Sequence, residues 1–159
     1  MSSKKMPSHI GVYSEYDWDG DGTIDYRSSE QSTYDKRGNL TSKVSEDDGN
    51  ADGAIERRES EQFTYDKRGN LTSKVTECEY DWNADGTIEY RSSEQSTYDK
   101  RGNLTSRVTE DDYGADGTIE YRSSERSTYD KRGNLTSRGT EDDYGAAGTV
   151  EYRASERST

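Results

Sequence analysis

Acidic side chains alternate with other residues in a short stretch that recurs along the chain. Its first copy, D-W-D-G-D-G at residues 17–22, places carboxylates at the first, third and fifth positions, and residues 48–53 and 81–86 keep oxygen-bearing side chains there. Such alternation turns oxygen ligands inward around a hard cation, while the glycine at the sixth position allows a sharp turn. Further carboxylates follow at the ninth position and, in the second copy, at the twelfth. The pattern predicts calcium sites, with these candidate ligands: Asp17, Asp19, Asp21, Asp25, Asp48, Asn50, Asp52, Glu56, Glu59, Asp81, Asn83, Asp85 and Glu89.

The same residue types have a second interpretation, because Asp, Asn and Gly are also the residues that form turns. The ligand set shrinks toward the C-terminus: the fourth copy has Gly114 between Asp112 and Asp116, and the fifth keeps only Asp143. We therefore place the candidate calcium sites in the first three copies. Metal binding and plain turn formation both remain open for them.

Aromatic residues offer another kind of binding surface. The chain has 13 tyrosines, and these, with Trp18 and Trp82, recur with a regular spacing. A stripe of exposed rings is one arrangement that binds sugars. Cross-strand packing explains the same spacing, because aromatic pairs stabilise polar sheets, and it is the interpretation that we favour.

Catalysis has little support in the sequence. His9 is the only histidine and Cys78 the only cysteine, so no disulfide forms within one chain and no cysteine metal cluster exists. The carboxylates follow the repeat and do not converge with a nucleophile and a base. We expect a protein that is not an enzyme.

A repeat positions all of these groups. The stretch YDKRGNLTS occupies residues 34–42, 65–73, 98–106 and 129–137, at steps of 31, 33 and 31 residues. A period in this range indicates a repeat architecture. Between its copies, alternation predicts a longer strand, Thr23 to Tyr34, and a shorter one, Leu40 to about Glu46, with no helical pattern. The second repeat deviates, because Arg57 and Glu59 replace a tyrosine and a serine on one face and are spaced to pair.

Two short turns in each repeat favour an all-β, antiparallel meander of about ten strands, although the strand pattern leaves a solenoid winding open. We expect the array at residues 9–159 after a flexible tail at 1–8. A meander places all basic turns (35–39, 66–70, 99–103 and 130–134) along one edge. The acidic turns, counted here from the first aspartate to the ninth position (17–25, 48–56, 81–89, 112–120 and 143–151), would line the other edge.

The bulk composition limits the classes of function. Only 25% of residues are hydrophobic and 35% are charged, which by itself would suggest disorder, but the strict period indicates a folded chain with a thin core. The formal net charge of −12 argues against nucleic acid and anionic membranes as partners and suits cation binding. No stretch reaches the ~20 apolar residues of a membrane span, and no secretory signal is visible at the N-terminus.

The outermost strands are complementary. The chain opens on a strand of the shorter type, Ile10 to Tyr16, and closes on one of the longer type, Thr149 to Thr159. Exposed strand edges recruit other strands, so we expect head-to-tail self-association, unless the chain is a piece of a longer array. The candidate assembly residues are Ile10, Val12, Tyr16, Val150 and Tyr152.

The Tyr-Asp-x-x-Gly-Asn-Leu core resembles the YD repeats of the RHS/YD family, in four copies that span most of residues 10–159. The resemblance implies hairpins that tile long sheets in bacterial surface and secreted proteins, as a scaffold without chemistry of its own. The chain departs from that pattern at Asn39, Asn70, Asn103 and Asn134, where the family more often has arginine. The acidic stretches resemble the calcium loops of EF-hands and thrombospondin type 3 repeats, without the flanking helices of an EF-hand.

Two functions follow from these observations. The first is a structural β-repeat module of an extracellular filament, matrix or surface protein, with calcium in its acidic turns. The second is a binding module that presents its tyrosine-rich surface to a glycan or a protein. We favour the first, because the carboxylates are distributed by repeat, as in a structural array, and do not converge on one site.

Overall fold

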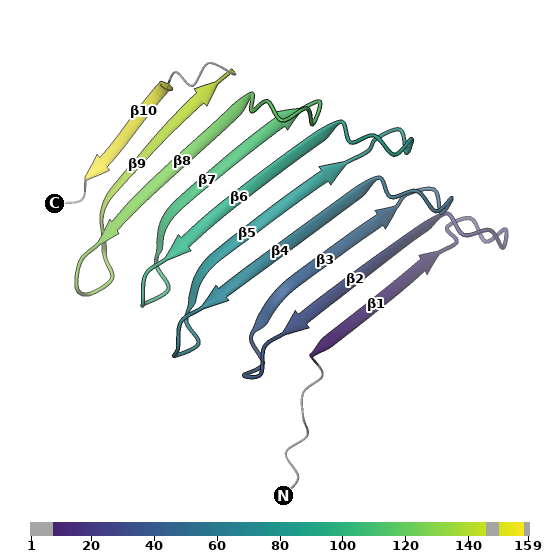
Figure 1. Cartoon of the computed structure of the whole chain (residues 1–159), viewed down its shortest axis with the longest axis horizontal. Helices are drawn as coiled ribbons and strands as arrows, with labels where there is room; N and C mark the ends of the chain where they lie inside the picture. Colours follow the sequence, from purple (N-terminus) through teal and green to yellow (C-terminus); the bar gives the residue numbers. More distant parts are fainter. Residues whose placement is uncertain (1–7, 146–149, 158–159) are drawn as a thin grey trace, which may run out of the picture.

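The computed structural model describes residues 8–145 and 150–157 (Figure 1). These residues form ten strands: β1 (His9–Tyr16), β2 (Tyr26–Tyr34), β3 (Leu40–Asp48), β4 (Arg57–Tyr65), β5 (Leu71–Tyr80), β6 (Tyr90–Tyr98), β7 (Leu104–Tyr113), β8 (Tyr121–Tyr129), β9 (Leu135–Tyr144) and β10 (Val150–Arg157). All ten belong to one sheet in chain order, and every neighbouring pair is antiparallel. The prediction of an all-β antiparallel meander is confirmed, and a solenoid winding is excluded for the described strands. In this part of the chain no helix is long and apolar enough to cross a membrane.

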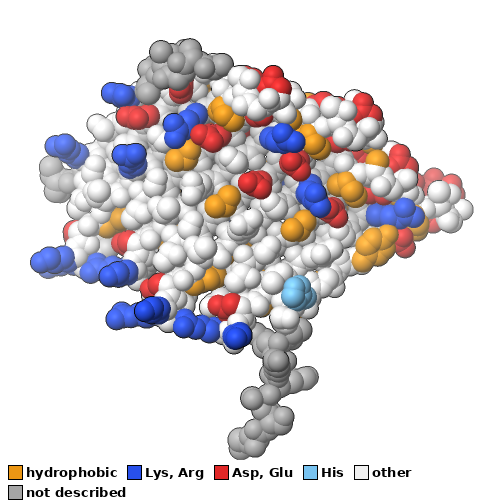
Figure 2. All heavy atoms as spheres, viewed as in Figure 1, with side chains coloured by type: hydrophobic (Ala, Val, Ile, Leu, Met, Phe, Trp, Pro, Cys, Tyr) orange, Lys and Arg blue, Asp and Glu red, His pale blue; other side chains and the backbone are white. Residues whose placement is uncertain are grey.

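The two kinds of turn lie on opposite edges of the sheet (Figure 1). Lysine and arginine side chains gather along the edge of the basic turns, and aspartate and glutamate along the edge of the acidic turns (Figure 2). This separation of charge follows from the meander, because every second turn returns to the same edge. The predicted arrangement of the two charged edges is confirmed.

The strands begin and end at slightly different residues than alternation predicts. The expected strand from Thr23 begins only at Tyr26, because the N–H of Thr23 donates to the Asp21 carboxylate at 2.7 Å and residues 23–25 belong to the turn. The shorter strand type runs to Asp48 in β3 rather than to Glu46. At the N-terminus, the carbonyl of Ser8 accepts the Tyr34 N–H at 2.9 Å, so this residue already pairs with β2. Thr149, Ser158 and Thr159, expected in the last strand, lie outside the described residues.

The register assigns each side chain to one of two faces, because neighbouring residues of a strand point to opposite sides. We call the side that carries Arg27 and Val44 the arginine face, and the side that carries Tyr26 and Asp47 the tyrosine face. A bulge between Thr33 and Tyr34, repeated in the later basic hairpins, adjusts the pairing at the basic turn. Val44, Val75 and Val108 therefore lie on the face opposite to the tyrosines near the acidic turns.

The sheet has no hydrophobic core in the part of the chain that the structure describes. Its buried side chains are polar: Ser32, Asp48, Asp81, Ser96, Asp112 and Ser127. Ser96 is 1% exposed because it lies between Lys74 on β5 and Arg107 on β7, whose long aliphatic segments cover it. The expected thin core is thus replaced by long charged side chains that lie over small ones.

Ion pairs run across both faces in register with the repeat. On the arginine face, directly opposite residues pair across every acidic turn at 2.7–3.2 Å: Glu15–Arg27, Glu46–Arg58, Glu79–Arg91, Glu110–Arg122 and Glu141–Arg153. On the tyrosine face, diagonal residues pair across the basic turns at 2.6–3.5 Å: Glu30–Lys43, Glu61–Lys74, Glu94–Arg107 and Glu125–Arg138. Each exposed pair contributes only about 0–1 kcal/mol to stability, so the ion pairs stabilise the sheet through their number and not through any single pair.

Each basic turn is closed by one aspartate and one asparagine. In the first, Asp35 accepts from the backbone N–H groups of Arg37 and Asn39 at 2.8 and 2.9 Å, and its other oxygen accepts from the Asn39 amide at 2.9 Å. Gly38 has a φ of 88°, a left-handed conformation that a glycine adopts without steric cost. The asparagine after the glycine is therefore the partner of the turn aspartate.

Candidate functional site

In each of the first four acidic turns, the first aspartate accepts hydrogen bonds from the backbone of that turn. In the second turn, Asp48 is 4% exposed, and its two carboxylate oxygens accept from the backbone N–H groups of Asp52 at 3.1 Å and Gly53 at 2.9 Å. Asp81 and Asp112 accept from the equivalent positions of their own turns at 2.7–3.2 Å. Burial of a carboxylate is tolerated here because hydrogen bonds compensate for the water that it loses.

Two more carboxylates cap the backbone of the same turn. Asp52, at the fifth position, accepts from the N–H of Ala54 at 2.9 Å. Glu56, at the ninth position, reaches back to the N–H of Gly49, which donates to its Oε2 at 2.6 Å. Equivalent contacts recur in the other described turns, through Asp21, Asp25, Asp85, Glu89, Asp116 and Glu120. The alternation of acidic residues thus has a structural role in the turn, whether or not metal binds.

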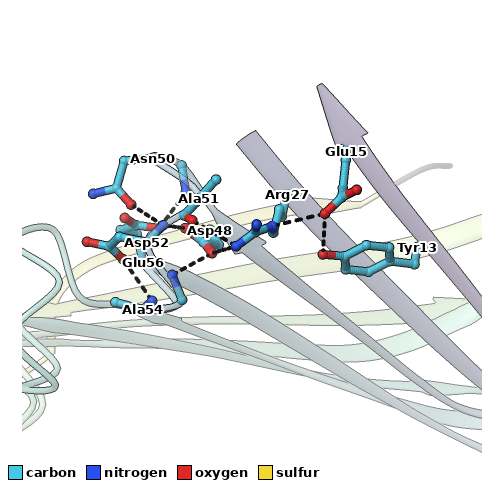
Figure 3. Close-up of polar contacts among 11 residues, drawn as sticks. Tyr13, Glu15, Arg27, Asp48, Asn50, Ala51, Asp52, Ala54 and Glu56 are labelled. Carbon is cyan, nitrogen blue, oxygen red and sulfur yellow. Dashed lines mark hydrogen bonds and ion pairs between the residues drawn. The ribbon is translucent and has the colours of Figure 1, made fainter. Parts of the chain in front are cut away.

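The carboxylates that cap a turn also come together in space. Oxygen atoms of Asp48, Asp52 and Glu56 lie within 4.8 Å of one another (Figure 3). The third and fourth turns group the residues at the same three positions, and the first turn groups its first, third and ninth positions: Asp81, Asp85 and Glu89; Asp112, Asp116 and Glu120; Asp17, Asp19 and Asp25. The fourth group is one that sequence reasoning missed. The carboxylate at the ninth position was the available signal, because Glu120 stands at the same offset as Glu56.

Two predicted carboxylate ligands lie outside the carboxylate groups of their turns. Glu59 lies on β4 and pairs with Arg57, and it is not part of the carboxylate group of the second turn, although the sequence matches the twelve-residue pattern there. A strand that follows the turn directly carries Glu59 away, whereas a helix would return it. Asp21 is not part of the first carboxylate group, and its carboxylate accepts from Thr23. That hydrogen bond lowers the pKa of Asp21 below its ordinary value of 3.8.

The asparagines at the third position complete the second and third turns. The side-chain oxygen of Asn50 accepts from the N–H of Asp52 at 3.1 Å, and Asn83 accepts from Asp85 at 3.0 Å. Both amide oxygens remain on the turn, beside the carboxylate groups. Residues 146–149 of the fifth turn, which include Ala147, lie outside the described residues.

Arginine side chains connect an acidic turn to the hairpin before it. Arg27 donates through Nε to Glu15 at 3.1 Å and through Nη1 to the carbonyl oxygen of Ala51 at 2.7 Å (Figure 3). The same nitrogen lies 3.9 Å from the Asp48 carboxylate. Two repeats later the same pair of contacts recurs with Arg91, Glu79 and Ala115. The carbonyl that accepts the arginine belongs to an alanine with a positive φ, 55° at Ala51 and 50° at Ala115.

Backbone hydrogen bonds link neighbouring acidic turns directly. The N–H of Asp81 donates to the carbonyl of Glu56 at 2.9 Å, and Gly114 and Gly145 donate to Glu89 and Glu120, each at 2.6 Å. These bonds connect the second, third, fourth and fifth acidic turns in series.

The candidate assembly residues lie on the two outermost strands. Ile10, Val12 and Tyr16 on β1 and Tyr152 on β10 are all exposed. Val150 belongs to β10, and its side chain lies outside the described part of the structure. Within that part, the outer edges of β1 and β10 pair with no other strand.

Cross-strand packing of the aromatic residues is confirmed at several positions. Tyr16 and Tyr26 are directly opposite each other with ring centroids 5.8 Å apart, and Tyr80 and Tyr90 repeat this at 5.7 Å. Trp18 stacks on Tyr26 at 5.7 Å, and Trp82 stacks on Tyr90 at 6.2 Å. Both indoles remain largely exposed.

Comparison with known proteins adds little to this geometry. No protein-family model matches the chain, and neither does any curated protein sequence. Among solved structures, it is similar to a porin-like protein from Bacteroides uniformis ATCC 8492, with 12% sequence identity over 95% of each chain and a TM-score of 0.23. A likeness this weak carries no argument about fold or function.

Proposed function

We propose that this chain is a non-enzymatic structural repeat module of an extracellular filament, matrix or surface protein, and that its acidic turns bind calcium. The observation that carries the proposal is the even distribution of its polar groups. The carboxylate groups occupy successive turns along one edge, and the described turns share the same capping contacts. A catalytic site would instead require unlike groups to converge on one reacting atom.

Calcium binding is supported by the recurring set of three carboxylates. Calcium takes 6–8 oxygen ligands, so each turn would complete the shell with an asparagine oxygen where one is present, backbone carbonyls and water. The capping hydrogen bonds do not prevent this, because each carboxylate oxygen has two lone pairs. A site with few protein ligands suits the ~10⁻⁴–10⁻³ M affinities of extracellular calcium modules, which supports our placing of the module outside the cell.

The test separates the role of a carboxylate as ligand from its role as a cap. The triple variant combines Glu56→Gln, Glu89→Gln and Glu120→Gln. Each new amide oxygen can still accept the backbone N–H, but each group of three carboxylates loses one negative charge. We expect isothermal titration calorimetry to show calcium binding to the parent protein and a clear loss of affinity in the variant. At 10 mM calcium and a dissociation constant of 1 mM, each site would stabilise the folded chain by about 1.4 kcal/mol.

Glu59→Gln is the matched control, because Glu59 lies in the same hairpin as Glu56 and pairs with Arg57 outside the carboxylate group. It should bind calcium as the parent does. No heat with the parent protein, and no shift of its melting temperature between chelator and millimolar calcium, would remove the metal from the proposal. Equal losses of calcium affinity in the triple variant and in Glu59→Gln would also argue against calcium binding by the carboxylate groups.

We further propose that the outer edges of β1 and β10 associate with other strands of the same kind, head to tail. Both edges carry unpaired backbone groups in the described structure, and neither is blocked by an internal proline. Strand β10 is of the longer type and β1 of the shorter type, so the contact would reproduce the pairing across an internal basic hairpin.

A further inference from the structure

A row of side chains crosses the tyrosine face beside the acidic turns, with one residue on each strand. We call it the tyrosine row. From β1 to β10 it consists of Tyr16, Tyr26, Asp47, Arg57, Tyr80, Tyr90, Asp111, Tyr121, Asp142 and Tyr152. Two further rings, Tyr113 and Tyr144, lie against Tyr90 and Tyr121 with centroids 5.3 and 5.1 Å apart. The row therefore presents aromatic rings and carboxylates together.

Arg57 interrupts the tyrosines and shows what this environment holds. Its Nη1 lies 3.1 Å from Oδ2 of Asp47, and its Nε donates to the hydroxyl oxygen of Tyr80 at 3.2 Å. Its guanidinium carbon also lies 5.9 Å from the centroid of the Tyr80 ring. A guanidinium is attracted both by the face of an aromatic ring and by a carboxylate, so the position satisfies both preferences.

Two other positions of the row have the same carboxylate but no arginine. Asp111 accepts from the hydroxyl of Tyr90 at 2.8 Å, as Asp47 accepts from Tyr26 at 2.7 Å. The residue directly opposite Asp111 is Tyr121, where Asp47 has Arg57. Asp142 likewise stands opposite Tyr152. Among the described residues, no lysine or arginine forms an ion pair with either aspartate.

The rings beside these aspartates are accessible. Tyr113, Tyr144 and Tyr152 are 55–58% exposed, and all three lie next to Asp111 or Asp142 in the register. Arginine side chains enter such a surface readily, because the guanidinium is weakly hydrated and stacks on rings. The net charge of −12 favours a cationic partner in addition.

We propose that the tyrosine row is a docking surface for a basic peptide, and that two arginines of the peptide occupy the positions beside Asp111 and Asp142. Each guanidinium would lie over tyrosine rings and pair with the carboxylate, as Arg57 does within the chain at Asp47. This goes beyond the structural role proposed above and does not depend on calcium.

The spacing of the two aspartates defines the shape of the peptide. Asp111 lies on β7 and Asp142 on β9, two strands apart, and Asp142 is also displaced by two residues along its strand, since it stands opposite Ser123 whereas Asp111 stands opposite Tyr121. The two aspartates are therefore about 12 Å apart, a span that two long arginine side chains can bridge. A polyproline II helix repeats every three residues and rises about 3.1 Å for each of them, so every third side chain returns to the same face after about 9 Å. The proposed partner is therefore a polyproline II segment with arginine at every third residue. Proline-rich segments dock on aromatic surfaces by this geometry.

The test uses the labelled peptide Arg-Pro-Pro-Arg-Pro-Pro-Arg and measures its binding by fluorescence anisotropy at low salt. In the variant Tyr121→Arg, the new side chain would fill the position beside Asp111 as Arg57 fills the one beside Asp47. We expect about tenfold weaker binding, since the peptide then keeps one of two linked contacts. Arg57→Tyr makes the opposite change, because it frees the position beside Asp47, and should tighten binding severalfold. Asp111→Asn should weaken it.

Gln95→Arg is the control for net charge. It places an arginine on the arginine face of β6, at the position where β8 naturally has Arg126, and its charge equals that of Tyr121→Arg. It should bind the peptide nearly as the parent does. Thermal melts of all variants verify that they remain folded.

Four results would overturn the proposal. The first is equal weakening in Tyr121→Arg and Gln95→Arg, because binding would then follow net charge alone. The second is unchanged or weaker binding in Arg57→Tyr. The third is equal affinity for a peptide whose arginines stand at every second residue. The fourth is a protein that binds a neutral oligosaccharide such as maltohexaose but not the peptide, and that loses the oligosaccharide in Tyr113→Ser. This result would assign the surface to glycans.

Discussion

Nη1 of Arg27 donates a hydrogen bond to the carbonyl oxygen of Ala51 at 2.7 Å, although the two residues are 24 positions apart and belong to different hairpins. The same guanidinium pairs with Glu15 on β1, so one side chain connects the first hairpin to the second acidic turn (Figure 3). In a sheet whose described residues include no buried hydrophobic side chain, such contacts add to the backbone ladders that join the hairpins.

Loss of this contact should destabilise the sheet locally. We expect Arg27→Met to lower the free energy of unfolding by about 1–2 kcal/mol, since a hydrogen bond and an ion pair are removed while the aliphatic packing is kept. Urea denaturation measures the change. Arg58→Met is the control: Arg58 pairs with Glu46 in the same way, but in the described structure it donates to no carbonyl of the next turn. Equal effects of the two variants would show that the bond to Ala51 contributes nothing.

The alanines at the fourth position of the acidic turns have a conformation that suits glycine. Ala51, Ala84 and Ala115 have φ values of 55°, 57° and 50°, and the first turn has Gly20 at the equivalent place. A side chain in this region strains the folded backbone by about 1–2 kcal/mol, and substitution by glycine removes that strain. The same substitution gives the unfolded chain more conformational freedom, which offsets about 0.4–1 kcal/mol of the gain. Glycine at all three positions should therefore raise the stability by about 1–3 kcal/mol, as seen in a higher denaturation midpoint.

Ala54→Gly is the matched control for these substitutions. Ala54 follows the same turn and is not among the described residues with a positive φ. The added freedom of the unfolded chain should therefore lower the stability of this variant. A gain in the control, or a loss in the triple variant, would contradict the assignment of backbone strain to the fourth position.

The aspartates of the basic turns make the fold sensitive to acid. The side-chain hydrogen bond from Asn103 is the main cause that holds the pKa of Asp99 below 3.8, and the pKa values of Asp35 and Asp130 are lowered in the same way. The pKa of Asp66 is lowered mainly by the backbone hydrogen bond from Asn70, with its side-chain bond second. The folded state thus favours the charged carboxylate. This stabilisation is present above the ordinary pKa and is lost as the pH falls through the lower folded value, so we expect acid unfolding to begin below about pH 4.

Asn103→Ala isolates the cause of this shift. A pH titration followed by carboxyl NMR signals should show a higher pKa for Asp99 in this variant, because the amide that binds the carboxylate is gone. The other three aspartates are the internal control and should titrate as in the parent. An unchanged pKa of Asp99 would mean that the backbone N–H groups alone lower it.

Charges on the edge strands should prevent self-association. In the double variant Ile10→Lys and Val12→Lys, β1 keeps its pairing with β2 and gains the charges that natural edge strands use against aggregation. Light scattering over a series of concentrations should show larger particles for the parent protein and monomers for the variant. A parent protein that stays monomeric at high concentration would exclude the head-to-tail contact.

Much of the fold follows from short-range patterns in the sequence. The period of the YDKRGNLTS stretch, the alternation between its copies and the turn residues predict the all-β meander, its two charged edges and the pairing of Arg57 with Glu59. These features depend on the direction of neighbouring side chains and on the turns that a few adjacent residues form, so a linear pattern is enough to show them.

Tertiary structure decided the features that depend on strand register and on contacts between hairpins. The chain leaves the second turn as strand β4, which takes Glu59 away from the carboxylate group. In the fourth turn, three carboxylates come together although the third position has no oxygen-bearing side chain. The bond from Arg27 to Ala51 and the placing of Asp111 opposite Tyr121 join residues of different hairpins. Such contacts are set by the bulges and turns that fix the register between strands, and a shift of one residue would move every side chain to the other face.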